Sequence, residues 1–194
     1  MNRKIIFLVV LAFPVLCMGG GFESSRLIDS KGGVIDVPKM ASVEFEPNSF
    51  LQKREAKIKY SCDYKKDGYT TDIMGIYQEH KIMSNGGPAH SCFFVIRTAE
   101  KPSKPLRIKI RVSQEFLTTL GGKFHPVLFV AVVQHGADNE QIDDVIPLDS
   151  NFDIGSKEIT AALPEYAFTN DFAWKWEHDV YEAFIIIGSA LTGT

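Results

Sequence analysis

Residues 106–112, LRIKIRV, show the clearest hydrophobic pattern in the chain. Their apolar side chains alternate with Arg107, Lys109 and Arg111, so an extended segment would have one apolar and one charged face. Residues 56–64, AKIKYSCDY, alternate in the same way. Both segments predict strands that have one face in a core and the other in water.

Other segments carry strand character of different kinds. Residues 91–99, SCFFVIRTA, are rich in β-formers, and residues 126–134, PVLFVAVVQ, are apolar on both faces. The second pattern predicts a central strand covered on both sides. Shorter strands are expected at 142–148 and 156–163, and a short helix at 114–120.

Two regions are harder to interpret. The turn signal Asp67-Gly68 predicts a hairpin whose second strand covers 70–78. Residues 170–182 place Trp174 and Trp176 on one face if they are extended, but they also show a helical apolar stripe. We favour the strand there because aromatic and β-branched residues dominate, and the helix remains the alternative.

The count is eight or nine short strands separated by Gly, Pro and Asn turns. This arrangement predicts a mainly β protein, an antiparallel β-sandwich of immunoglobulin-like or jelly-roll type with little helix.

The N-terminus has the pattern of an export signal. Arg3 and Lys4 precede an apolar run, and small residues follow at Gly19–Gly21. The run is too short to span a bilayer as a helix, so no membrane span is expected. We expect residues 1–21 to be a signal peptide and residues 22–194 a single domain, exported to the periplasm, the cell surface or the medium. A lipid anchor at Cys17 is the alternative, but Leu16 before it is larger than such cleavage sites prefer.

The chain contains 21 basic and 24 acidic residues and has a net charge of −3. Removal of the signal peptide takes Arg3 and Lys4 away and makes the mature protein more acidic. Nonspecific nucleic-acid binding requires a clustered basic surface, so we exclude nucleic acid as a partner.

Export places Cys62 and Cys92 in an oxidising compartment, where an even pair predicts a disulfide. We expect this bond to join neighbouring strands. The alternatives are two free buried thiols, or a thiolate nucleophile in His90-Ser91-Cys92, which would need a reduced cysteine.

The chain has no nucleophile elbow, phosphate-binding loop, dinucleotide fingerprint or zinc-protease motif. We therefore expect a protein that is not an enzyme and needs no cofactor.

A candidate calcium site consists of Asp149, Asn151 and Asp153, whose side-chain oxygens occur at alternate positions before Gly155. An Asx-turn is the simpler explanation of the same residues.

Two surfaces could bind a ligand or a partner. Arg107, Lys109 and Arg111 form a basic stripe on one strand, which could contact an anionic partner or be a solvated face. The segment 166–176, YAFTNDFAWKW, could stack on sugar rings through Trp174 and Trp176, or these aromatics could close the core.

We therefore expect an exported, non-catalytic β-sandwich that binds a protein partner as part of an envelope complex, an appendage or an adhesion system. The alternative is a carbohydrate-binding module or a carbohydrate-active enzyme that uses residues 166–176 to bind a glycan.

Overall fold

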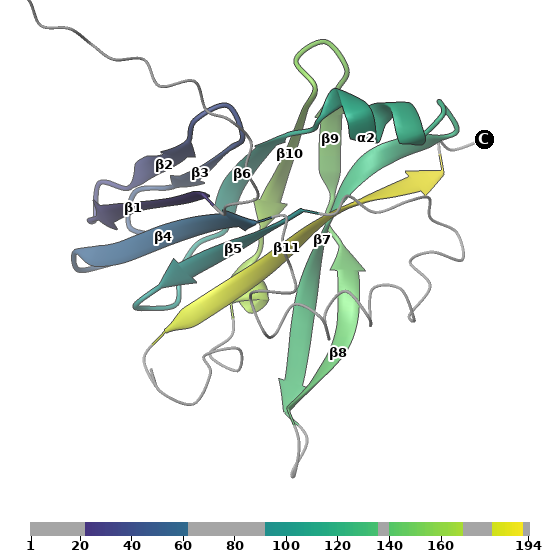
Figure 1. Cartoon of the computed structure of the whole chain (residues 1–194). Coiled ribbons are helices and arrows are strands. Elements are labelled where there is room, and N and C mark those ends of the chain that lie inside the picture. The colour runs from purple at the N-terminus through teal and green to yellow at the C-terminus, as the bar shows by residue number, and fades with distance from the viewer. Residues whose placement is uncertain (1–21, 62–91, 136–139, 169–179, 192–194) are drawn as a thin grey trace, which may run out of the picture.

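The computed structural model describes residues 22–61, 92–135, 140–168 and 180–191. Within these ranges the chain forms 11 strands, which belong to two antiparallel sheets packed against each other (Figure 1). The prediction of an antiparallel β-sandwich with little helix is confirmed. None of the helices in the described ranges is long and apolar enough to cross a membrane.

The larger sheet has six strands, and each pairs antiparallel with its neighbours. Across the sheet they are β1 (Phe22–Ile28), β4 (Arg54–Ser61), β5 (Phe93–Thr98), β11 (Tyr181–Leu191), β7 (Phe124–His135) and β8 (Glu140–Pro147). The strand that comes latest in the described chain, β11, therefore lies in the middle of this sheet.

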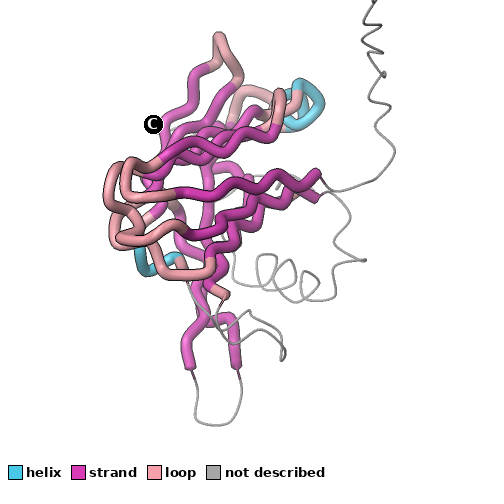
Figure 2. Tube along the Cα trace, turned by 90° about the vertical axis from the view of Figure 1, so that its left-hand side faces the viewer, coloured by secondary structure: helices cyan, strands magenta, loops and turns pink. Residues whose placement is uncertain are grey.

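The smaller sheet has five strands, which are also antiparallel. Across the sheet they are β2 (Gly33–Val37), β3 (Ala41–Phe45), β6 (Leu106–Arg111), β10 (Glu158–Leu163) and β9 (Ser150–Asp153). Two short helical segments, α2 (Gln114–Thr119) and the 3-10 helix η2 (Glu165–Ala167), lie at opposite ends of the strands in both views (Figure 2).

The core lies between the two sheets. In β6 the apolar residues Leu106, Ile108 and Ile110 are buried, while the basic residues between them are exposed. They belong to one apolar cluster with Phe94 and Ile185 of the larger sheet. Full burial of each such side chain stabilises the folded state by about 1.5–3 kcal/mol. The alternation of apolar and basic residues in β6 therefore determines which face of the strand points into the core.

The two sheets differ in how their outer faces are covered. In the middle of the larger sheet, β5, β11 and β7 are buried on both faces. Phe93 and Phe184 stack there with ring centres 4.9 Å apart. Neither belongs to the apolar cluster between the sheets. The outer face of the smaller sheet, in contrast, carries exposed and half-buried polar residues.

The covered outer face of the larger sheet contains a buried acidic residue. Glu182 of β11 is 2% exposed and forms an ion pair with Arg97, its register partner on β5. A buried carboxylate needs such a partner, because leaving it unpaired in the interior is costly.

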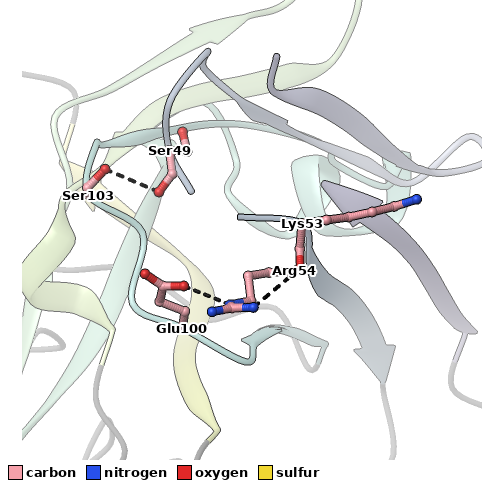
Figure 3. A network of polar contacts seen from close by, with 5 residues as sticks. All are labelled: Ser49, Lys53, Arg54, Glu100 and Ser103. Carbon is pink, nitrogen blue, oxygen red and sulfur yellow. Dashed lines mark hydrogen bonds and ion pairs between the residues drawn. The ribbon is translucent and has the colours of Figure 1, made fainter. Parts of the chain in front are cut away.

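One end of the sandwich is held by polar contacts between two loops, 46–53 and 99–105 (Figure 3). Arg54 Nε donates to Glu100 Oε2 at 2.7 Å, and Ser103 Oγ donates to the Ser49 carbonyl at 3.2 Å. Lys104 Nζ donates to the Pro47 carbonyl at 2.8 Å. We call this the tied end, and it is where β6 begins.

Most predicted elements are present at nearly the predicted positions. The expected strands appear as β4, β5, β6, β7, β8 and β10, and the expected helix appears as α2. The strands β1, β2, β3 and β9 were not predicted, so the expected count of eight or nine was too low. The hairpin strand at 70–78 and most of the segment 170–182 lie outside the described residues.

Candidate functional site

The basic stripe lies in the middle of the smaller sheet. Arg107, Lys109 and Arg111 are exposed because β6 alternates strictly between buried and exposed positions. Because β6 lies between β3 and β10, the stripe cannot serve to protect a sheet edge from aggregation. It crosses the outer face of the sandwich instead.

Lys109, in the middle of the stripe, is flanked by short side chains on both sides, whereas Arg107 lies opposite Glu44 on one side and Arg111 lies opposite Glu158. Ser42 of β3 and Thr160 of β10 are the register partners of Lys109, and Ala162 is the partner of Arg107. Because these neighbours are small, the longer cationic side chains project above the surface of the sheet.

Two of the three cations form ion pairs, and the third, Arg111, has Glu158 as its register partner on β10. Arg107 Nη1 lies 3.5 Å from Glu44 Oε2, and Lys109 Nζ lies 3.6 Å from Glu158 Oε2. Each exposed pair contributes little to stability, about 0–1 kcal/mol. Within the described residues Arg111 has no ion pair.

A shallow hollow lies on one side of Lys109, toward the turn between β2 and β3. We call it the turn hollow. It has a volume of about 470 Å³, and its charged lining residues are Asp36, Lys39, Lys109, Arg111 and Glu158. Pro38 and Met40 add apolar surface to the lining. Three cations therefore face two acids in this hollow.

A second hollow lies on the other side of Lys109, toward β9. It has a volume of about 540 Å³, and its charged lining residues are Glu46, Arg107, Lys109 and Asp149. We call it the β9 hollow. Its two cations face two acids, so of these two hollows the turn hollow is the one with an excess of positive charge.

The calcium candidate is placed on and beside β9. Asn151 and Asp153 are exposed, and Asp149, also exposed, comes just before the strand. Residues two apart along a strand are separated by about 6.5–7 Å, so three alternating side chains on a straight strand do not converge on one ion. In the described ranges there is no cluster of three or more His, Cys, Asp or Glu side chains that could hold a metal.

Asp153 instead accepts hydrogen bonds within its own turn. The Gly155 amide donates to Oδ1 at 2.8 Å, and Ser156 Oγ donates to Oδ2 at 2.9 Å. The Gly155 hydrogen bond, followed by the Ser156 hydroxyl, holds the pKa of this carboxyl below its usual value. These contacts are those of an Asx-turn.

The aromatic segment is only partly described. Trp174 and Trp176 lie outside the described residues, so their predicted role is not tested. At the start of the segment, Tyr166 is 56% exposed, whereas Phe168 is 3% exposed and belongs to the core.

Cys92 is buried, 5% exposed, and directly precedes β5. Cys62 and Cys17 lie outside the described residues, so the predicted pairing of Cys62 with Cys92 stays a prediction. The same holds for His90 as a neighbour of that thiol.

The sequence matches no model of a known protein family, and no curated protein matches it either. Function must therefore be argued from the surface itself.

The sequence pattern found the basic stripe but missed the acids and the turn that complete the turn hollow. Asp36 and Lys39 come from the β2–β3 hairpin and Glu158 comes from β10, far away in sequence, and only the sheet order brings them together beside β6. One local signal was available, since Pro38 is a favoured residue at the second position of a β-turn.

Proposed function

We propose that this chain is an exported, non-catalytic β-sandwich that binds a protein partner through the outer face of its smaller sheet. One observation carries the proposal. The larger sheet has its middle strands buried on both faces, whereas the smaller sheet leaves its outer face open. An open face with charged side chains and two hollows is the surface most available to a partner.

The export part of the proposal rests on the N-terminal sequence. Arg3 and Lys4, the apolar run and the three glycines have the order of a signal peptide. In this proposal the mature domain covers residues 22–194 and functions in the periplasm, at the cell surface or outside the cell. Tethering through Cys17 remains the alternative.

The strand register supports the proposed disulfide. Ser61 of β4 is the partner of Phe93 of β5. If this register continued for one more residue, position 62 would lie opposite Cys92. Directly opposed residues of antiparallel strands have Cα atoms about 4.5–5.5 Å apart, a separation that a disulfide can bridge. An oxidising compartment would then make this bond a staple between neighbouring strands.

The alternative function, glycan binding by the segment 166–176, depends on Trp174 and Trp176. The exposed ring of Tyr166 at the start of the segment is the described feature that favours it. The buried ring of Phe168 favours the core explanation for the same segment.

Site-specific photo-cross-linking in the intact native host tests the proposal. A photo-reactive residue at Thr160 would report on the outer face of the smaller sheet, and one at Ser25 would serve as the matched control. Ser25 is exposed on β1, opposite Lys57, on the outer face of the larger sheet. We expect one discrete protein adduct from position 160 and none from position 25.

Two outcomes would contradict the proposal. One is the absence of any adduct from position 160. The other is glycan-array binding that is abolished by Trp174→Ala together with Trp176→Ala, which would favour the carbohydrate alternative.

A further inference from the structure

The two turns at one end of the smaller sheet are hydrogen-bonded to the end of β6. The Arg111 amide donates to the Met40 carbonyl at 2.7 Å, and the Val112 amide donates to the Lys157 carbonyl at 2.9 Å. The turn between β2 and β3 and the turn between β9 and β10 therefore lie on either side of Arg111. In Figure 1 the β9–β10 loop and α2 lie together at this end. We call it the cationic end.

Both turns hold a lysine in an unfavourable backbone conformation. Lys39 has φ of 65° and Lys157 has φ of 58°. Glycine adopts this left-handed region without steric cost, and asparagine tolerates it, but lysine has no such advantage. The Met40 amide donates to the Val37 carbonyl at 3.0 Å, which places Pro38 and Lys39 at the centre of a tight turn. Glycine or asparagine is the usual residue at the third position of such a turn.

Strained residues persist where the side chain is needed. The side chain of Lys39 lines the turn hollow beside that of Arg111. Both residues are exposed, and neither has an ion pair within the described part of the chain. The third cation, Lys109, is paired with Glu158. The strain and the two unpaired cations therefore occur in the same small region.

We propose that the turn hollow binds an acidic segment of a protein partner, with Lys39 and Arg111 as the residues that contact its carboxylates. The proposal deepens the function proposed above and depends on it. A carboxylate suits this site because the planar guanidinium of Arg111 can bind both of its oxygens. Lys39 adds a second positive charge to the lining of the same hollow.

The mixed composition of this end favours a protein over a membrane or an anionic polysaccharide. Asp36 and Glu158 line the same hollow and would repel a uniformly negative surface. Pro38 and Met40 offer apolar contact, and Ile154 in the adjacent turn is 80% exposed. Apolar side chains beside a few charges are typical of protein interfaces.

The test measures binding of a fluorescent peptide of alternating Glu and Gly by anisotropy at low salt. The variants are Lys39→Gly, Arg111→Gln and the double variant. Lys101→Gln is the matched control, because Lys101 is exposed in the loop 99–105 at the tied end and lines neither hollow. Vesicles containing phosphatidylserine and a sulfated polysaccharide are the other two probes.

We expect the double variant to weaken peptide binding by at least about tenfold, and the control to change it by less than about twofold. Binding should also weaken as salt is raised, because the contact is exposed. Lys39→Gly should weaken binding while it raises the melting temperature, a combination that a merely structural residue would not give.

Three results would overturn the inference. They are equal losses of peptide affinity in Lys101→Gln and in the double variant, tighter binding to vesicles or polysaccharide than to the peptide, and no peptide binding at low salt. A discrete adduct from position 160 in the cross-linking experiment, together with any of these results, would leave the proposed function standing and remove only the acidic segment.

Discussion

The two ends of the sandwich use their charged side chains differently. At the tied end Arg54 is paired with Glu100 (Figure 3), and Lys104 donates to the Pro47 carbonyl. At the cationic end Lys39 and Arg111 face the turn hollow and have no ion pair within the described residues. The tied end uses its cations to connect its own loops, whereas the cationic end presents them to solvent.

Backbone conformation shows the same contrast. At the tied end the left-handed positions are held by Gly32 and Asn48, with φ of 76° and 65°, and both residue types suit this region. In the β2–β3 and β9–β10 turns of the cationic end they are held by Lys39 and Lys157, whereas the positive-φ glycines Gly121 and Gly122 follow α2. The tied end is therefore optimised for stability, while the cationic end gives up some stability to keep two lysine side chains.

The largest expected change in the free energy of unfolding is at the tied end. In Gly32→Ala a new Cβ would contact the Phe45 carbonyl oxygen and lie 2.8 Å from the carbonyl carbon of Glu46, in a left-handed backbone. Strain and overlap together should lower the free energy of unfolding by about 2–4 kcal/mol. Chemical denaturation measures this loss. Gly121→Ala, which also has a positive φ but no atom within 4 Å of the new Cβ, should lose clearly less.

At the cationic end we expect a smaller change in the free energy of unfolding, and here the substitutions should stabilise the protein. Lys39→Gly and Lys157→Gly should each raise the free energy of unfolding by about 0.5–1 kcal/mol, because relief of left-handed strain exceeds the entropy cost of glycine. Denaturation of both variants beside Asn48→Gly measures the difference. Asn48→Gly should change stability little. An equal gain in all three would mean that the two ends are not differently strained.

The smallest effect concerns Asp153 in the β9–β10 turn. The Gly155 amide and the Ser156 hydroxyl lower the pKa of this carboxyl, so its ionised form stabilises the folded state. That contribution is present above the pKa of the unfolded chain and is lost as pH falls through the lower folded pKa. In Asp153→Asn the acid-side decline in stability should be shallower than in the natural protein. Denaturation midpoints across the acid range measure this, and parallel curves would contradict it.

The fold was largely predictable because alternation and burial agree in most strands. In β6 and β7 the pattern of apolar residues alone indicates which faces are buried, and the structure has the same arrangement. The strands β1, β2, β3 and β9 were missed for a physical reason. β1 exposes or half-exposes six of its seven residues, so it has almost no apolar pattern, and β2, β3 and β9 are only four or five residues each.

The sequence predicted the basic stripe of the candidate site but not the other residues that line the turn hollow. Arg107, Lys109 and Arg111 follow directly from the alternation of one strand. The turn hollow also needs Asp36 and Lys39 beside β6, and this proximity results from the pairing of β3 with β6 across about 60 residues of intervening chain. No local pattern in the sequence encodes that pairing.

The central place of β11 has a consequence for how the protein is made. β11 alone connects β5 to β7 within the larger sheet, and it is the last of the described strands to leave the ribosome. Until it emerges, β1, β4 and β5 form one sheet fragment and β7 and β8 another, with no hydrogen bonds to join them. A nascent chain therefore cannot complete its larger sheet before β11 has been synthesised, and the two halves of that sheet depend on this one strand to join them.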